Sequence, residues 1–245
     1  MAVAFETGLS IMVFIFLGTL AGGAAVTVIC KGFKKNVLYL NVFCGGILAG
    51  ILGFDLVPEL MSSYHPIGIM AGMSFGVFFM MLMDRILHYS KYPSNHQSDS
   101  AALLFLALLL HSIPSGLALG LNFQVEHFQV NALLMAVLFH HIPEGMVMMT
   151  AVLYAKKKMR TFWLFSFLLA LAVGGNTFLG MIIDLDTLKL QTMFMGAAVG
   201  TLSYVTFFEI IWKELKNHFA INMLTVALAG IIFIKFYLLL FQIDH

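Results

Sequence analysis

Two short segments of this sequence carry the same unusual combination of residues. One reads His111-Ser-Ile-Pro-Ser-Gly and the other His140-His-Ile-Pro-Glu-Gly, and both lie inside long apolar runs. Residues four apart share one face of a helix, so His111 faces the same side as Ser115, and His140 the same side as Glu144. Imidazole and carboxylate groups together suit zinc and other first-row divalent ions. The two segments therefore predict a metal ion held between two helices.

The candidate ligands of this site are His111, His140, His141 and Glu144. His141 stands three residues before Glu144, so in a helix both side chains can bind on the same side. The alternative is that the histidines only form hydrogen bonds between helices. Ionisable groups inside an apolar span usually mark function, and three histidines with a carboxylate at helical spacing favour a metal site.

Each segment also contains a proline and a glycine that affect the backbone. Pro114 and Pro143 each remove a hydrogen-bond donor and free the carbonyl four residues earlier. Such breaks are tolerated in membrane helices where a neighbour or a wet cavity satisfies the freed group. Gly116 and Gly145 follow, and we expect them to let another backbone come close.

The composition places both segments in a membrane. Of the 245 residues, 61% are hydrophobic and 10% are charged, whereas a soluble domain carries about 25% charged residues. No linker is long enough for a second domain, and the start of the chain lacks the basic region of a signal peptide. We expect one all-α polytopic membrane domain over residues 1–245, with lipid and metal ions as partners and no nucleic acid. Its eight spanning stretches are predicted at 7–30, 37–60, 66–89, 101–121, 130–155, 162–183, 191–212 and 219–242.

The basic residues indicate how the helices are oriented. Lys and Arg accumulate in cytoplasmic loops. Alternate loops of the chain lie on opposite sides of the membrane, which gives two sets of loops. One set holds only Lys189, and Lys235 lies within the last stretch. Both termini are therefore predicted outside, in a multi-pass protein of the cell (plasma) membrane. The other basic residues all fall in the other set of loops: Lys31, Lys34, Lys35, Arg85, Lys91, Lys156, Lys157, Lys158, Arg160, Lys213 and Lys216.

The second and seventh stretches cross the membrane in opposite directions, yet they share a pattern. Inverted repeats of this kind are common in secondary transporters, whose sites lie near the midplane at the repeat interface. Chance glycine spacing in Gly-rich membrane helices is the alternative. The shared residues are two glycines and a glutamate at identical spacing: Gly46, Gly50 and Glu59 in one, and Gly196, Gly200 and Glu209 in the other.

The paired segments resemble the metal-binding helices of the ZIP (Zrt/Irt-like) family of divalent metal transporters, whose fourth helix typically reads His-Asn-x-Pro-Glu-Gly. The second stretch, GGILAGILGFDLVPEL, and the seventh, GTLSYVTFFEII, are similar to their family counterparts. The resemblance covers the whole chain and implies eight helices with both termini outside. It also implies that the protein is a transporter and not an enzyme. The transporter would move zinc, iron, manganese or cadmium into the cytoplasm. Homodimers occur among similar transporters, although no segment here demands one.

By position, the resemblance implies that His111, His140 and Glu144 contribute to the main metal site. His141 falls where a second, adjacent site has a ligand, and Glu144 would sit between the two sites.

This sequence also departs from the family pattern. Ser115 replaces the glutamate of the fourth helix, and Ser112 replaces its asparagine. The sixth helix usually supplies another glutamate, and here only Asn176 lies near that place. Three imidazoles, one carboxylate and a divalent ion carry a net charge of about +1. We expect a single ion, with zinc favoured over manganese because imidazole suits zinc better.

Other acidic residues lie toward the ends of the predicted helices. Asp55, Glu59 and Glu209 are candidates for the transport path or, alternatively, for interfacial anchors. Asp84 and Arg85 are expected to form a solvated pair at the end of the third stretch.

Two other functions remain open. Ser115 and the missing acid of the sixth helix are also compatible with a non-transporting metal sensor or a degenerate family member. An intramembrane metalloenzyme is a further alternative, since three ligands with an open position can activate water. The chain lacks the His-Glu-x-x-His motif of such hydrolases.

Overall fold

The computed structural model describes residues 2–32, 37–89, 96–123, 130–183, 188–217 and 221–240, in which no strand occurs. Eight helical segments follow one another in these residues: α1 (Ala2–Gly32); the composite of α2 (Val37–Ile51), η1 (Leu52–Leu56) and α3 (Val57–Ser63); α4 (Pro66–Tyr89); α5 (His96–Asn122); α6 (Val130–Tyr154); α7 (Met159–Ile182); the composite of α8 (Leu188–Tyr204), η2 (Val205–Trp212) and α9 (Lys213–Asn217); and α10 (Ile221–Leu240).

These segments follow the eight predicted stretches in order. The predicted stretch 66–89 coincides with α4, whereas α1 and α5 begin about five residues before the predicted starts. The prediction followed apolar runs, and a helix can continue beyond the hydrocarbon into polar residues. In the described part of the chain, seven segments are long and apolar enough to cross a membrane; α6, whose side chains are described only from residue 141, is the eighth segment.

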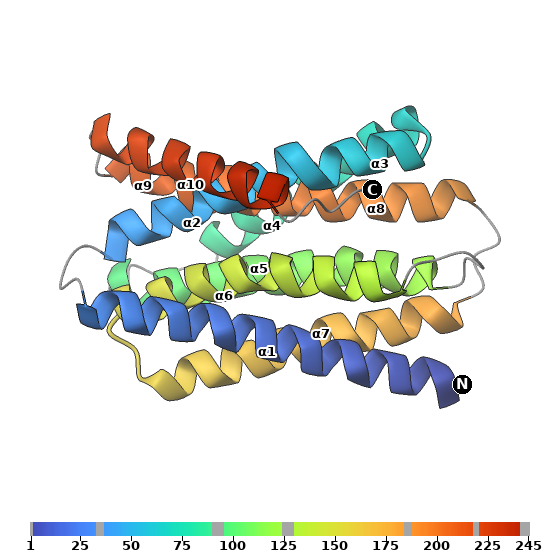
Figure 1. The fold of residues 1–245 in the computed structure, drawn as a ribbon, viewed down its shortest axis with the longest axis horizontal. Helices are drawn as coiled ribbons and strands as arrows, with labels where there is room; N and C mark the ends of the chain where they lie inside the picture. The colour runs from blue at the N-terminus through green and yellow to red at the C-terminus, as the bar shows by residue number, and fades with distance from the viewer. Residues whose placement is uncertain are drawn as a thin grey trace.

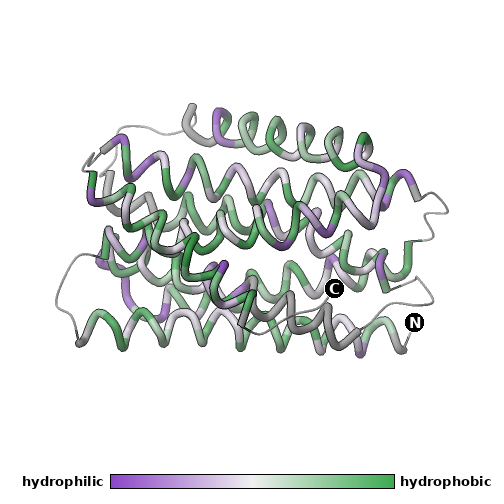
Figure 2. The backbone as a smooth tube through the Cα atoms, turned by 45° about the horizontal axis from the view of Figure 1, so that its top comes forward, coloured by the Kyte–Doolittle hydropathy of each residue, from purple (hydrophilic) through white to green (hydrophobic). Residues whose placement is uncertain are grey.

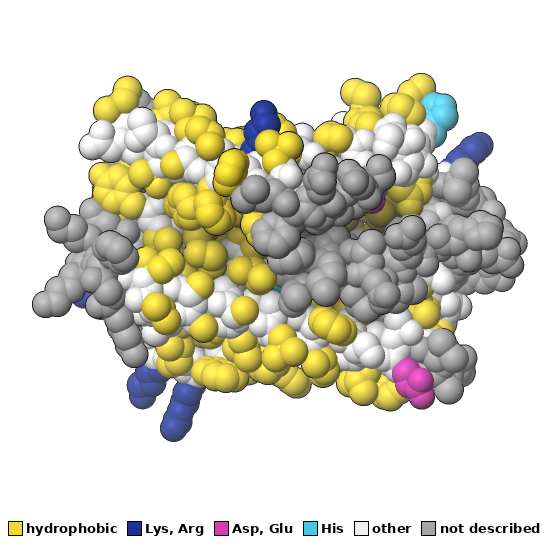
Figure 3. All heavy atoms as spheres, in the orientation of Figure 1, with side chains coloured by type: hydrophobic (Ala, Val, Ile, Leu, Met, Phe, Trp, Pro, Cys, Tyr) yellow, Lys and Arg dark blue, Asp and Glu magenta, His cyan; other side chains and the backbone are white. Residues whose placement is uncertain are grey.

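Successive segments run in opposite directions along the long axis of the molecule (Figure 1). The last segment, α10, accordingly runs from the α9 end back toward the side where α1 begins. Apolar residues predominate along the helices (Figure 2), and hydrophobic side chains are spread over the described part of the face seen in Figure 3. Lipid-facing residues such as Ile67, Phe236 and Phe5 are more than 60% exposed. This surface fits a bilayer rather than water.

The two prolines lie inside continuous helices. Pro114 is within α5 and Pro143 is within α6, and both helices continue to their far ends. Each proline therefore removes one hydrogen bond without ending its helix. The α-helical hydrogen-bond pattern is interrupted elsewhere, in η1 and η2, which are π-helical. The sequence did not predict these two segments. Such π-helical turns often occur near functional sites.

The helices form two bundles. The first bundle consists of α1, α5, α6 and α7; the second consists of α2–η1–α3, α4, α8–η2–α9 and α10. They occupy the lower and upper halves of Figure 1, respectively. The bundles meet mainly where α5 packs on α8 and where α6 packs on α2. We call this double contact the seam.

Glycines show that the packing itself is repeated. A Cβ atom on Gly46 of α2 would lie 2.1 Å from the carbonyl oxygen of Ala227 in α10. The equivalent Gly196 of α8 would bring a Cβ atom to 2.4 Å from the carbonyl oxygen of Ile69 in α4. The predicted repeat is thus present in three dimensions: the two glycine patterns bring α10 and α4 to the same faces of α2 and α8.

We predict that Gly200→Ala lowers the melting temperature of the purified protein, because the new Cβ atom would lie 2.2 Å from the Met73 carbonyl oxygen. Overpacking of this kind costs about 1–3 kcal/mol. Gly175→Ala is the matched control, since nothing lies within 4 Å of its Cβ position. Thermal unfolding in detergent checks the prediction, and equal melting temperatures for the two variants would contradict it.

Candidate metal site

The site lies on the facing sides of α5 and α6, next to the seam. The proline-containing helices carry His111 on α5 and His141 and Glu144 on α6. All three residues are buried, at 3%, 5% and 1% exposure. A carboxylate this deep in an apolar bundle needs compensation from hydrogen bonds or positive charge.

Glu144 connects the two histidines. Its Oε2 atom lies 2.6 Å from Nδ1 of His141, three residues earlier on the same helix. Its Oε1 atom lies 3.7 Å from Nε2 of His111 on the other helix. The second distance exceeds a hydrogen bond, but zinc at about 2.0–2.2 Å from each ligand holds them roughly 3.3 Å apart. A small side-chain movement would therefore allow one ion to join His111 and Glu144.

The described side chains include no group of three His, Cys, Asp or Glu residues already gathered in metal-holding geometry. His140 lies in α6, but its side chain is outside the described residues. Of the predicted four-ligand set, the structure describes the His111–Glu144 and His141–Glu144 contacts, and the set itself stays a prediction.

Thr201 of α8, which the sequence did not point to, contacts His111 from across the seam. Its hydroxyl donates to the carbonyl oxygen of Ala198 at 2.9 Å. It also lies 2.8 Å from Nδ1 of His111. Because the hydroxyl hydrogen is already used, we infer that Nδ1–H of the imidazole donates to Thr201. That tautomer directs the lone pair of Nε2 toward Glu144, as a metal ligand requires.

We predict that Thr201→Val lowers zinc affinity by about 10- to 100-fold, the usual effect of removing a hydrogen bond that orients a ligand. Thr201→Ser keeps the hydroxyl and should restore affinity to near the original value. Zinc titration of the purified variants measures both. Equal affinity of the Val and Ser variants would mean that the hydroxyl does not orient His111.

The two serines of the first motif differ in role. Ser112 is buried, and its hydroxyl donates to the carbonyl oxygen of Leu109 at 2.6 Å, so it is engaged within its own helix. The hydroxyl oxygen of Ser115 is also buried but has no hydrogen-bond partner among the described residues. Ser115 is therefore the serine with an oxygen left for an ion or a water molecule.

Asn176 of α7 packs beside the same motif. A Cβ atom on Gly116 would lie 2.7 Å from Cβ of Asn176, so Gly116 allows α7 to approach α5. The side-chain amide of Asn176 donates to the carbonyl oxygen of Ala172 at 2.8 Å. Asn176 thus lies next to the motif, and its amide nitrogen is engaged within α7.

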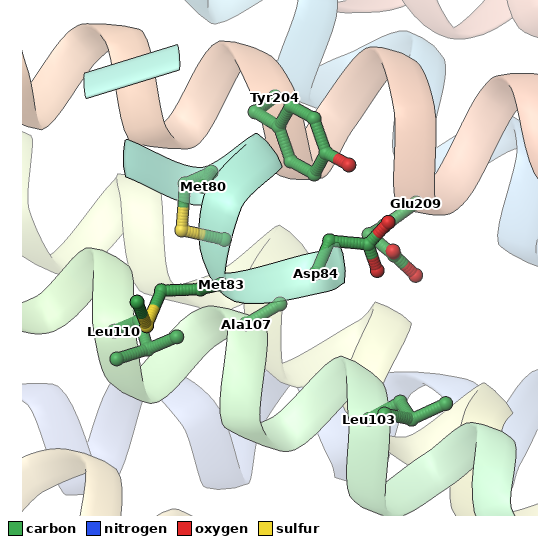
Figure 4. A pocket seen from close by; sticks show the side chains of 8 residues that line it. All are labelled: Met80, Met83, Asp84, Leu103, Ala107, Leu110, Tyr204 and Glu209. Atoms are coloured by element: carbon green, nitrogen blue, oxygen red, sulfur yellow. The ribbon is translucent and has the colours of Figure 1, made fainter. Parts of the chain in front are cut away.

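Glu209 belongs to a small pocket closer to the α9 end of the molecule. Its carboxylate pairs with Lys213 at 3.1 Å and points into the pocket together with Asp84 and Tyr204 (Figure 4). Tyr204 forms a hydrogen bond with Asp84. Asp84 is half-buried and Arg85 is exposed, and the expected solvated Asp84–Arg85 pair stays a prediction. The apolar residues lining the pocket are Met80, Met83, Leu103, Ala107 and Leu110.

The two remaining acidic candidates, Asp55 and Glu59, lie in the α2–η1–α3 composite, which corresponds to α8–η2–α9 in the repeat. Asp55 is half-buried in η1, and Glu59 is exposed in α3, so Glu59 does not belong to the buried cluster. Lys235 of α10 lies over the ring of Phe54, with its ammonium 5.1 Å from the ring centre. This cation–π contact accounts for one basic residue within an apolar helix.

Comparison with known proteins gives an independent result. The family described as ZIP zinc transporter matches residues 90–237, which include the whole of α5 to α9. The zinc transporter ZIP1 of Danio rerio is 30% identical to this chain. The alignment covers 75% of this chain and 78% of that protein. The matched region contains every residue of the buried His–Glu cluster and Thr201.

Proposed function

Since the chain belongs to the ZIP zinc transporter family, we propose that it moves divalent metal, with zinc as the principal substrate, across a membrane into the cytoplasm. The observation that carries the proposal is the buried carboxylate of Glu144 between His141 and His111. A group of this kind offers an entering ion both neutralising charge and ligand atoms in a site away from bulk water.

We propose that His111, His140, His141 and Glu144 bind the ion, with the Ser115 hydroxyl beside them. The imidazole nitrogens and the carboxylate replace part of the hydration shell of the metal, and imidazole favours zinc among the common divalent ions. Because the site contributes one negative charge, the bound complex keeps a net charge of about +1. The ion is then held less tightly than in a carboxylate-rich centre, which suits release.

The pocket with Glu209 and Asp84 is the proposed exit. The loops at this end carry Lys156, Lys157 and Lys158, and the positive-inside rule places them in the cytoplasm. The two carboxylates would attract the cation as it leaves the midplane site. In this orientation both termini are outside, and the plasma membrane is the proposed location.

Isotopic uptake by proteoliposomes tests this function. Zinc, iron, manganese and cadmium are offered separately at the same concentration, with protein-free liposomes as the control. We expect zinc to accumulate inside the vesicles at several times the control rate. Tight zinc binding by the purified protein without any uptake would instead favour the metal sensor.

A further inference from the structure

Each end of the seam carries a polar cluster of three residues that the metal site does not use. The first, the Asn122 cluster, consists of Tyr64, Asn122 and Gln191. Tyr64 and the side-chain amide of Gln191 both donate to Oδ1 of Asn122, the latter at 3.1 Å. Asn122 and Gln191 are 3% and 9% exposed. Asn122 belongs to the first bundle and its two partners to the second, so these bonds cross the seam.

The second, the Asn41 cluster, consists of Asn41, Thr150 and Glu214. The Thr150 hydroxyl lies 2.9 Å from Oδ1 of Asn41 and 2.7 Å from the carbonyl oxygen of Val147, and its one hydrogen can be donated to either acceptor. The Asn41 amide donates to Glu214 at 3.0 Å. Thr150 belongs to the first bundle and is 1% exposed, while Asn41 and Glu214 belong to the second. This cluster also crosses the seam, at the end predicted to face the cytoplasm.

The two clusters occupy equivalent positions of the inverted repeat. In the glycine pattern, each residue of the α2–η1–α3 composite is equivalent to the residue 150 positions later in α8–η2–α9. By that relation Asn41 corresponds to Gln191, and Tyr64 corresponds to Glu214. The third members, Asn122 and Thr150, fall within one residue of equivalence when the two His-Ile-Pro segments are superposed. The same three places therefore carry polar contacts at both ends.

The clusters flank the metal site along the helix axis. At 1.5 Å per residue, Asn122 lies about 16 Å beyond His111 on α5, and Thr150 lies about 9 Å beyond Glu144 on α6. Burial and the charge of Glu59 raise the pKa of the Tyr64 phenol above its usual value, so it stays protonated and donates. In this structure both clusters are closed while His111, His141 and Glu144 are buried between them.

We propose that the Asn122 and Asn41 clusters are matched latches that close the two ends of the seam over the metal site, and that release of one exposes the site to that side. The latches are suited to reversible opening, because one hydrogen bond changes an equilibrium by only about two- to tenfold. The proposal rests on the transport function proposed above, since it states how the buried site gains access to each side.

Thiol labelling in detergent tests the latches without requiring transport. The chain has two cysteines, Cys30 and Cys44, and replacing them by Ser and Ala gives a background without thiols. Ala118→Cys reports on the Asn122 end and Ala107→Cys on the pocket end. Both positions are buried, on either side of His111 along α5. The rate of reaction with a small maleimide then measures the opening of each end.

Tyr64→Phe combined with Gln191→Leu should raise labelling at position 118 by about fivefold and change labelling at position 107 by less than about twofold. Asn41→Leu combined with Thr150→Val should have the reverse effect. No increase at the matching reporter would overturn the proposal, as would equal increases at both reporters. If a double variant does not fold, Tyr64→Phe and Thr150→Val alone are nearly isosteric, and each should raise its own reporter about twofold.

Failure of the latches is distinguishable from failure of the transport function. Zinc uptake in proteoliposomes with unselective labelling would remove the latches and leave the transporter. End-selective labelling without uptake would support a two-latched seam in a protein that does not transport.

Discussion

Glu144→Gln is expected to abolish zinc uptake and to lower zinc affinity by at least about 100-fold. Residues that only orient ligands already contribute about 10- to 100-fold, so loss of a direct anionic ligand should exceed that range. The glutamine keeps the shape and one carbonyl oxygen, but it removes the charge that compensates the divalent ion. The residue is 1% exposed, so water cannot replace the missing group readily.

Glu6→Gln is the matched control, because Glu6 is an exposed glutamate of α1 away from the cluster. Uptake rate and zinc titration are measured on both variants after size-exclusion chromatography has established that each is monodisperse. Uptake by Glu144→Gln within about twofold of the unsubstituted protein would remove Glu144 from the transport site.

The second large effect concerns metal choice. We expect the protein to bind one zinc ion per chain, at least about tenfold more tightly than manganese, because a site rich in imidazole favours zinc. Ser115→Glu should reduce this preference and permit a second ion. The new side chain would extend from the place now taken by the Ser115 hydroxyl, a buried group whose oxygen has no hydrogen-bond partner among the described residues.

Ser112→Ala is the control for this substitution, because the Ser112 hydroxyl is engaged with the Leu109 carbonyl oxygen. Competition between zinc and manganese on the purified proteins gives the preference, and elemental analysis gives the number of ions per chain. Tighter binding of manganese than zinc, or two tightly bound ions without Ser115→Glu, would contradict the one-ion site.

Several features could be read directly from the residues. The order of the eight helices followed from apolar length, since a span of hydrocarbon requires about 20 apolar residues. The pairing of His141 with Glu144 followed from helical spacing and is present at 2.6 Å. The glycine pattern of the second and seventh stretches also predicted the repeat, because close helix contact requires a residue without a side chain.

No sequence pattern of this kind predicted the contacts between different helices. The approach of His111 to Glu144 depends on how α5 and α6 are rotated against each other, which no local spacing determines. Thr201 satisfies its own hydroxyl within α8 and resembles any other threonine in an apolar helix. The contact of Asp84 with Tyr204 also had no sequence signal, because the neighbouring Arg85 was the only partner that local spacing suggested for Asp84.

Local hydrophobicity and helical period were therefore sufficient to predict the order of the helices, their internal repeat and the residues that share a helix face. Which helix faces meet across the seam depends instead on contacts between residues that are far apart in the chain. That outcome depends on glycine contacts such as Gly46 against α10 and Gly196 against α4, which bring backbones together and thereby place His111, Glu144 and Thr201 within reach of one another.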